Sequence, residues 1–565
     1  MAAMRSNLKG QDRIGTNRDT SSLNKRGMVL ILVLVVIPVL TLAALTYSEL
    51  MLVEREASQV ALRHVQAREL AQSGIDAVRV FLSTDTDTQT QAGGWYDNPS
   101  LWSSQLVIDD PDPRYCGLFS LIAPALQEGD YAGIRYGIED ESARINLNTL
   151  IVIDRFLPGT ARELLMALPG MDESIADAIL DWMDSDDEPR EYGAEADYYL
   201  ALNPPYSPKN GPLESIEELL LVRGVTPYLL FGADVNRNGL IDPGEPNPAS
   251  VPELQGYEDT MSRGWSAYLT LWSKELNIRS DGTVKIDVNQ DDLEKLYTEL
   301  EELFGSHWAT YIVAYRQQEE PYQAGQSSEE EVETEPSGQL DLSRNGNLQL
   351  TTILDLIGQR VRVQYQGEEE AKILESPFPD LPEAMDLYLP LLMEHLTAVP
   401  NTVITGRINI NQAPRLVLQG LPGMTPEIVE EIIARRVEDP SQAEPYQKYE
   451  TWILQEGIVT LEEMKALIPL ICAGGDVYRV QAVGYFEREG PAARIEGVLD
   501  TTKRPAAILF WREMSHLGGF AAEAGSYSNF AALTPTRLLE RLRQKNLSPL
   551  AIVGMDRSGA TFLRR

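Results

Sequence analysis

Cysteine and histidine are scarce in this chain of 565 residues, which has two cysteines and four histidines. Cys116 and Cys472 show no metal-ligand spacing, and they can form at most one disulfide in an oxidising compartment. Because nothing in the sequence fixes their relative position, whether they pair stays open. None of the histidines lies in a recognisable catalytic motif. We therefore expect a protein without enzymatic activity.

Basic residues are also few, with 48 Lys and Arg against 85 Asp and Glu and a formal net charge of −37. The two ends of the chain are the exception: residues 1–27 carry six basic and two acidic residues, and residues 512–565 carry eight basic and four acidic residues. The acidic middle repels nucleic acid and anionic lipid surfaces and favours cation binding. The length allows three or four domains.

One long uncharged run extends from Met28 to Ser48 and contains 21 residues. As a helix it would be about 31 Å long, which matches the hydrocarbon thickness of a bilayer. The basic leader predicts that residues before the run stay in the cytoplasm and that the rest is exported. No small-residue cleavage site closes the run, so cleavage in front of it fits better than an ordinary signal peptide.

The run continues without Pro through residues 49–82, where apolar and charged positions mix. This pattern predicts an amphipathic helix that is continuous with the membrane segment. We expect Leu62, Val65, Leu70 and Val78 to form its packing stripe.

Gly27, directly before Met28, resembles the site at which prepilin peptidases remove a basic leader from members of the type IV pilin superfamily. Pilins usually have Glu at the fifth mature position, where this chain has Leu32. The pseudopilin that usually lacks this Glu is GspK, the large minor pseudopilin at the tip of the type II secretion pseudopilus. The alternative is a plain signal anchor with a chance Arg-Gly-Met sequence.

An internal repeat is visible as RINLN at 144–148, KIDVN at 285–289 and RININ at 407–411. Each copy opens a helical segment, and the pattern predicts strand, helix, tight turn and helix. The LPGM turns at 168–171 and 421–424 resemble helix-hairpin-helix motifs, which in DNA-repair proteins bind phosphate through backbone amides. Acidic residues follow both turns here, so we expect a structural use.

The stretch from Asp181 to Val225 closely resembles the helical domain inserted into the pilin fold of GspK, including its Gly-Ala-Glu, Pro-Pro-Tyr and Glu-Glu-Leu elements. The resemblance extends from Gly27 to about Trp511, whereas the second repeat and residues 512–565 look like additions. It implies an α+β, type IV pilin-like fold, in which a long N-terminal helix packs on a small antiparallel sheet. Large all-α insertions with helix-hairpin-helix-like repeats would interrupt that fold.

This fold predicts an order of segments along the chain. Alternating residues at 131–141 and 477–500 predict strands of the sheet. The insert near 317–347 is too polar and acidic to fold. The expected segments are a basic leader (1–27), a transmembrane part (28–48), a spine helix (49–82), the first part of the pilin-like domain (83–148), an inserted helical domain with the calcium loop (149–265), a second helical repeat (266–316), an acidic disordered loop (317–347), a third helical repeat region (348–472), the C-terminal strands (473–511) and a basic tail (512–565).

The segment ADVNRNGLIDPGE matches an EF-hand-type calcium loop. Calcium binds about six to eight oxygens, and this spacing supplies side-chain oxygens, a backbone carbonyl and a bidentate carboxylate, with Gly239 at the turn. Pro243 and Pro246 argue against a long following helix, so we expect an isolated structural loop. The alternative is a solvated Asn-Gly turn. The expected ligands of Ca²⁺ are Asp234, Asn236, Asn238, Leu240, Asp242 and Glu245.

A second acidic cluster runs from Asp181 to Glu188, after a predicted helix whose carboxyl end should prefer positive charge. This misfit indicates a bound cation or a nearby arginine. A second calcium site would use Asp184, Asp186 and Asp187. The alternative is a solvated loop with Arg190 as the counter-ion.

The resemblance implies a non-enzymatic minor pseudopilin that forms part of the pseudopilus tip and serves protein secretion across the outer membrane. Its expected partners are other minor pseudopilins and a prepilin peptidase that cuts between Gly27 and Met28. It implies a single-pass protein of the inner membrane with its C-terminal bulk in the periplasm. The alternative is a membrane-anchored helix-hairpin-helix DNA-binding protein of natural transformation, although the acidic charge argues against nucleic acid.

Overall fold

The chain divides into two units, Met1–Val65 and Gln66–Arg565. The computed structural model describes residues 20–237, 245–251, 263–322, 332–368, 370–488 and 490–517. Helix α1 (Thr20–Leu82) begins in the first unit and ends in the second. Each unit is described by itself below.

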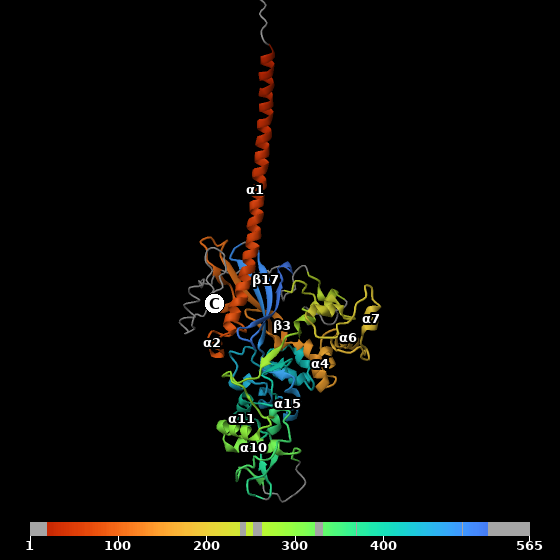
Figure 1. The fold of residues 1–565 in the computed structure, drawn as a ribbon, viewed down its shortest axis with the longest axis vertical. Helices are drawn as coiled ribbons and strands as arrows, with labels where there is room; N and C mark the ends of the chain where they lie inside the picture. The colour runs from red at the N-terminus through yellow and green to blue at the C-terminus, as the bar shows by residue number, and fades with distance from the viewer. Residues whose placement is uncertain are drawn as a thin grey trace, which may run out of the picture. The chain divides into compact units, whose positions relative to one another are not determined.

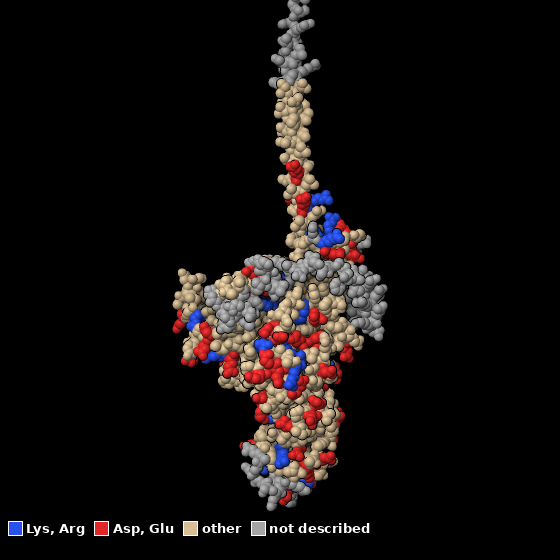
Figure 2. Space-filling view, turned by 180° about the vertical axis from the view of Figure 1, so that it is seen from behind, with Lys and Arg blue, Asp and Glu red and all other residues tan. Residues whose placement is uncertain are grey.

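The described part of the first unit is the N-terminal portion of α1. Its most apolar window has a mean hydropathy of 2.7, and none of that window is buried. In Figure 2 the upper part of this helix has no charged side chains, whereas acidic and basic side chains are visible lower down. Among the described residues, α1 is the one helix long and apolar enough to cross a membrane, which agrees with the predicted anchor.

The second unit contains an antiparallel sheet on which the C-terminal part of α1 packs. The strand order is β1-β2-β16-β17-β18, with β3 paired to β2 and β4 paired to β16. Ile75 and Val78 of α1 share a hydrophobic cluster with Leu121 and Val480 of the sheet. The sheet strands are β1 (Gln105–Ile108), β2 (Gly117–Gln127), β3 (Asp130–Arg135), β4 (Glu139–Asp140), β16 (Val477–Phe486), β17 (Ala493–Asp500) and β18 (Ala507–Glu513), and nearby lie α2 (Thr86–Gln91), α3 (Pro99–Trp102) and η8 (Ser515–Leu517).

The predicted stripe of α1 is half correct. Leu70 and Val78 are 2% and 0% exposed, but Leu62 and Val65 are 58% and 56% exposed. Buried side chains begin at Ala67, the second residue of the second unit, where α1 meets the sheet.

The three sequence repeats each begin and end with a two-residue strand, and the two strands of each repeat pair in parallel. The pairs are β5 with β6, β8 with β12, and β14 with β15. Each repeat is therefore a closed module. The first comprises η1 (Glu141–Ala143), β5 (Ile145–Asn146), α4 (Leu147–Phe156), α5 (Thr160–Met166), α6 (Glu173–Met183), α7 (Ala196–Leu200), η2 (Ile216–Leu221), α8 (Pro227–Phe231), η3 (Pro248–Ser250), η5 (Trp265–Ala267) and β6 (Leu269–Thr270).

The other two repeats follow the same plan. The second comprises β8 (Ile286–Asp287), α9 (Leu293–Phe304), α10 (Ser306–Gln317), β9 (Val332–Glu333), η6 (Ile353–Leu356), β10 (Arg360–Val363), β11 (Lys372–Glu375), α11 (Pro382–His395) and β12 (Leu396–Thr397). The third comprises β14 (Ile408–Asn409), α12 (Arg415–Gln419), α13 (Pro426–Arg435), η7 (Pro445–Lys448), α14 (Trp452–Gln455), α15 (Leu461–Leu467) and β15 (Ile471–Cys472). An antiparallel pair, β7 (Lys274–Leu276) with β13 (Val403–Thr405), brackets the second repeat. In Figure 1, α10 and α11 lie at the end of this unit opposite β17.

The last Asn of each repeat signature clamps a distant backbone segment of its own module. Asn148 exchanges two hydrogen bonds with the backbone of Leu213, at 3.0 and 2.8 Å. Asn289 makes the same pair with Leu350, both at 2.9 Å. Asn411 donates to backbone carbonyls and accepts from a buried indole N–H. The asparagines that end the three signatures therefore satisfy buried backbone groups, as a closed module requires.

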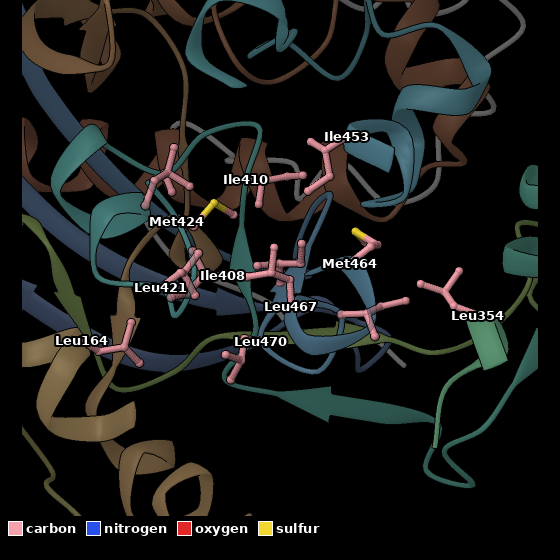
Figure 3. Packing of buried hydrophobic residues seen from close by; sticks show 14 of the residues in the cluster. Leu164, Leu354, Ile408, Ile410, Leu421, Met424, Ile453, Met464, Leu467 and Leu470 are labelled. Carbon is pink, nitrogen blue, oxygen red and sulfur yellow. The ribbon is translucent and has the colours of Figure 1, made fainter. Parts of the chain in front are cut away.

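One hydrophobic cluster extends through all three repeats. Figure 3 shows Leu164 of the first repeat, Leu354 of the second and Leu421 of the third among its members. The first and third repeats approach closely, because a Cβ on Gly420 would lie 2.9 Å from the Cβ of Ala167. The repeats therefore share one core.

The second and third repeat regions differ from the purely helical expectation. Strands β9, β10 and β11 form a three-stranded sheet. Residues 332–347, expected in a disordered loop, include β9 and Leu340, which is 3% exposed. The acidic composition of this segment led to the prediction of disorder, although a few of its apolar residues pair in a strand or pack in the core. Residues 323–331 of that expected loop lie outside the described residues.

The cysteines do not pair. Cys116 and Cys472 are both buried free thiols. Cys116 lies directly before β2 and donates to the Asp110 carbonyl at 3.1 Å, while Cys472 ends the third repeat. Burial raises the pKa of Cys472 well above its ordinary value, so this thiol stays protonated.

Gly484 of β16 is predicted to be essential for packing α1 on the sheet. A Cβ at this position would lie 2.1 Å from the Ala67 carbonyl oxygen. We expect Gly484→Ala to lower the free energy of unfolding by about 1–3 kcal/mol or more through overpacking, measured by urea unfolding of the full chain in detergent. Gly474→Ala is the matched control, because nothing lies within 4 Å of a Cβ there. Equal stability of the two variants would contradict the prediction.

Candidate metal sites and their junction with the sheet

The predicted calcium loop is described at its two ends. Asp234 is 2% exposed and lies three residues after the end of α8. The backbone N–H of Asn236 donates to Oε1 of Glu245 at 2.9 Å, so the third and twelfth loop positions lie together. Asn238, Gly239, Leu240 and Asp242 lie outside the described residues. The structure thus brings the two described ends of the loop together, and calcium binding stays a prediction.

A buried arginine of the sheet holds the start of this loop. Arg494 of β17 is 1% exposed. It donates from Nη1 to the carbonyl oxygen of Asn236 at 2.9 Å and from Nη2 to that of Arg237. Burial lowers the pKa of Arg494 to about 10, although carboxylates nearby oppose this effect, so it stays charged at neutral pH. The sheet therefore fixes the backbone at the third and fourth loop positions.

A chain of ion pairs supports the same junction. Arg237 stacks on Phe231 at 3.8 Å and pairs with Glu217 at 3.2 Å. Glu217 also pairs with Arg512 of β18, which contacts Glu496 of β17 at 2.9 Å. These alternating charges join the first repeat to two strands.

The turn at 140–141 forms the second connection between repeats and sheet. Asp140 accepts from Asn409 Nδ2 at 2.9 Å and from the Gly475 N–H at 2.7 Å. Glu141 is fully buried and pairs with Arg479 at 2.5 Å and Arg144 at 3.3 Å. Burial alone would raise the pKa of Glu141, but the two arginines outweigh it and keep the pKa below its ordinary value.

The second acidic cluster has an arginine counter-ion, as the alternative predicted. Arg190 donates to Asp181 at 2.8 Å and also to Asp184. The other two predicted ligands have local partners. Asp187 accepts from Asn210 at 2.9 Å, and Asp186 accepts from its own loop. Among the described residues, no group of three or more His, Cys, Asp or Glu side chains is arranged as a ready metal site.

Glu195 is a residue of this cluster that the sequence reasoning missed. It is 5% exposed, and neither carboxylate oxygen has a hydrogen-bond partner among the described residues. Burial, followed by repulsion from Asp181 and Asp184, raises its pKa to about 7. Asp184 Oδ1 is also buried without a partner there. The Gly-Ala-Glu element was the sequence signal that could have pointed to Glu195. Its glycine, Gly193, lies so close to Asp181 that a Cβ there would be 1.8 Å from the Asp181 carboxylate.

The two LPGM turns use their amide groups locally. Asp172 caps α6 by accepting from the Ile175 N–H at 2.9 Å, and Thr425 caps α13 in the same way at 3.4 Å. The helix starts that would face a phosphate are therefore occupied by side chains of the chain itself. Gly27 and Met28 lie within α1, and the structure does not describe their side chains.

Comparisons with known proteins show that the first repeat is similar to one family. The family Type II secretion system (T2SS), protein K, matches residues 143–231. Type II secretion system protein K of Pseudomonas aeruginosa is 36% identical over 101 residues, which are 17% of this chain and 30% of that protein. The protein of the same name from Klebsiella pneumoniae is 24% identical over 205 residues, 36% of this chain and 60% of that protein. The chain thus spans less than two thirds of either relative.

A solved structure also matches. It is the GspK-GspI-GspJ complex of the type 2 secretion system from enterotoxigenic Escherichia coli, with 12% identity, a TM-score of 0.34 and coverage of 82% of this chain and 98% of that chain. The family match and the two relatives confirm the resemblance to GspK-like minor pseudopilins.

Glu195 predicts a pH-dependent loss of stability when divalent cations are absent. Its carboxyl has a pKa near 4.5 in the unfolded chain and about 7 in the folded chain, so the folded state holds more protons between these values. Stability should therefore fall as pH rises through this window and stay level above it. In EDTA, we expect Glu195→Gln to raise the free energy of unfolding at pH 8 by about 1–2 kcal/mol more than it does at pH 4.5, measured by urea unfolding.

Glu188→Gln provides the matched control, because this acid belongs to the same cluster but is exposed. Its effect should not change with pH by more than a few tenths of a kcal/mol, about the level of an ordinary surface substitution. A difference between wild type and Glu195→Gln that stays constant from pH 4.5 to 8 would contradict the assignment.

Proposed function

We propose that this chain is a minor pseudopilin of a type II secretion system, with a pilin-like fold, that forms part of the pseudopilus tip and serves protein secretion across the outer membrane. It acts by assembly and not by catalysis. The proposal rests on the position in the fold of the residues that match the protein K family. Residues 143–231 lie in an insertion that begins after β4 and ends before β16, two strands that pair through Asp140 and Tyr478.

The N-terminal helix supports assembly from a membrane. Its apolar side chains are exposed along the first unit, as a lipid or neighbouring helices would require. Leu32 occupies the fifth position after Gly27, where pilins have a Glu that costs about 2.5–3.5 kcal/mol in a bilayer unless paired. A subunit without this Glu needs no partner amine above it in the filament. This suits a subunit at the tip.

The alternative of a DNA-binding transformation protein finds no support. The comparisons point to secretion proteins. Figure 2 shows acidic side chains spread over the visible face of the second unit, where a phosphate backbone would be repelled.

The proposed function predicts processing and complex formation. The full chain is expressed with a prepilin peptidase and the other minor pseudopilins encoded beside it. We expect a mature chain that begins at Met28 and purifies as a stoichiometric complex with those pseudopilins, measured by intact mass, amino-terminal sequencing and co-purification. A chain that keeps its leader, or is cut after Ser48, contradicts the processing step.

Two controls separate the steps of this experiment. Gly27→Leu should block cleavage, because the resemblance implies a small residue before the cut, and should leave the leader attached. A catalytically inactive peptidase should give the same uncut chain. A cut chain that binds no other pseudopilin would contradict the tip assignment but not the processing.

We further propose that the loop at 234–245 binds calcium. Asp234, Asn236 and Glu245 fit the ion, because they supply the carboxylate and amide oxygens that calcium prefers and Glu245 reaches back to the third loop position. Bound calcium would supply the positive charge that holds these oxygens together. A second ion is proposed at Asp184, Asp186 and Asp187. The Glu195 carboxylate, which has no hydrogen-bond partner among the described residues, adds a donor there that faces like charges.

Calcium binding gives a separate prediction. We expect Asp234→Asn to weaken calcium binding by the full chain in detergent at least tenfold, because it removes a charged ligand at the first loop position. The measurement is isothermal titration calorimetry after EDTA treatment. Glu302→Gln, an exposed acid of α9, is the control and should bind like wild type. Equal affinities of Asp234→Asn and Glu302→Gln would contradict the loop assignment.

A further inference from the structure

Two exposed tyrosines lie close together on the first repeat. Tyr192 and Tyr198 are 44% and 39% exposed. Arg223 connects them, because its guanidinium carbon lies 5.4 Å from the centre of the Tyr198 ring and its Nη2 donates to the backbone carbonyl of Tyr192. These three residues are therefore neighbours on one surface.

The same surface extends to the end of η2. The buried Tyr199 ring lies 5.2 Å from the Tyr198 ring and 5.5 Å from the Tyr206 ring. The Tyr206 hydroxyl donates to the carbonyl of Leu221 at 2.8 Å, and Leu221 is 48% exposed. Direct contacts thus link these residues into one surface. We call Tyr192, Tyr198, Tyr206, Leu221 and Arg223 the aromatic patch.

The composition of the aromatic patch is typical of a protein-binding surface. Tyrosine and arginine are enriched among the residues that carry most of the binding energy at protein interfaces. The rim of the patch is acidic, because Glu191 directly precedes Tyr192, Asp197 directly precedes Tyr198, and both acids are exposed. The patch therefore suits an apolar segment that also carries basic residues.

The described part of the chain ends near this patch. Arg512 of β18 pairs with Glu217 of η2, and Leu221 is the last residue of the same η2. The four residues from Glu217 to Leu221 cover about 8 Å in a 3₁₀ helix. The last described residue, Leu517, follows Arg512 by five residues. Residues 518–565, which lie outside the described residues, therefore continue from the neighbourhood of the patch.

These last residues have the chemistry that the patch suits. Residues 518–565 carry seven basic and three acidic residues, whereas the chain between the leader and residue 512 is strongly acidic. The segment 537–545 combines four basic residues with Leu538, Leu539 and Leu542, a spacing that would place the leucines on one face of a helix. The twenty residues from Leu517 to Arg537 can span up to about 70 Å, so this segment can reach the patch.

We propose that the tail segment 537–545 docks on the aromatic patch of its own chain. Its leucines would cover the tyrosine rings and Leu221, and its arginines would pair with Glu191 and Asp197 or stack on the rings. The docked tail would hold the first repeat beside the strand from which the tail continues. Because both parts belong to one chain, occupancy of the patch should not depend on protein concentration.

Photo-crosslinking of the full chain in detergent tests the proposal. Tyr198 is replaced by the photo-reactive amino acid benzoylphenylalanine, the protein is irradiated at two concentrations, and crosslinked peptides are identified by mass spectrometry. We expect crosslinks to residues 533–550 within one chain, with the same yield at both concentrations. The control position is Leu387, which is 77% exposed on α11, a helix well separated from α7 in Figure 1. It should not crosslink to the tail.

Charge reversal tests the ionic part of the contact. Arg541→Glu combined with Arg543→Glu should lower the crosslinked fraction about fivefold or more, because two attractions to the acidic rim become repulsions. Lys503→Glu combined with Arg504→Glu is the matched control. It changes the net charge equally, but these exposed residues lie before β18 and outside the patch. This control should crosslink like the protein with the native charges.

Each result decides the proposal. Crosslinks to the tail that are absent, that form equally from Leu387, or that survive the tail charge reversal would overturn it. Crosslinked dimers whose yield falls on dilution would assign the patch to a second copy. Loss of the crosslink in nanodiscs that contain phosphatidylglycerol would assign the tail to an anionic membrane. If the Tyr198 variant does not fold, Leu221 carries the crosslinker instead. Failure here leaves the pseudopilin assignment intact, because that is tested by processing and complex formation.

Discussion

The fold depends on a buried polar turn through which the chain leaves the sheet and returns to it. Asp140 ends β4, accepts a hydrogen bond from Asn409 of the third repeat and accepts another from Gly475 just before β16. Glu141, the next residue, is fully buried between Arg144 of the first repeat and Arg479 of β16. More than three hundred residues are inserted between β4 and β16, so these few contacts set where the insertion sits. Removing one partner of such a buried pair is strongly destabilising, because the remaining charge is left uncompensated.

The repeats explain how such a long insertion stays compact. Each module closes on itself with a parallel pair of short strands and with an Asn that clamps its own backbone. The modules then share one hydrophobic core, in which side chains of all three repeats meet (Figure 3). Local closure lowers the loop-closure entropy that each module must overcome. The second repeat adds a module and its own small sheet by the same construction.

Charge is arranged differently inside and outside this protein. The surface is acidic, whereas the junction between the first repeat and the sheet concentrates arginines such as Arg494 and Arg512. These arginines hold loop carbonyls and carboxylates that would otherwise be buried without partners.

The sequence by itself determined the elements that rest on local patterns. The apolar run predicted the membrane helix, alternation predicted the strands near 131–141 and 477–500, and the repeat signatures marked where each module begins. It did not reveal Glu195 or Arg494, because burial and a partner more than two hundred residues away decide their roles. It also placed Leu62 and Val65 in a packing stripe, since periodicity identifies a face but not the residue at which a packed neighbour begins. Only the tertiary structure decided which carboxylates receive an arginine, as Asp181 does, and which, like Glu195, have none among the described residues, because electrostatic compensation depends on distance in space.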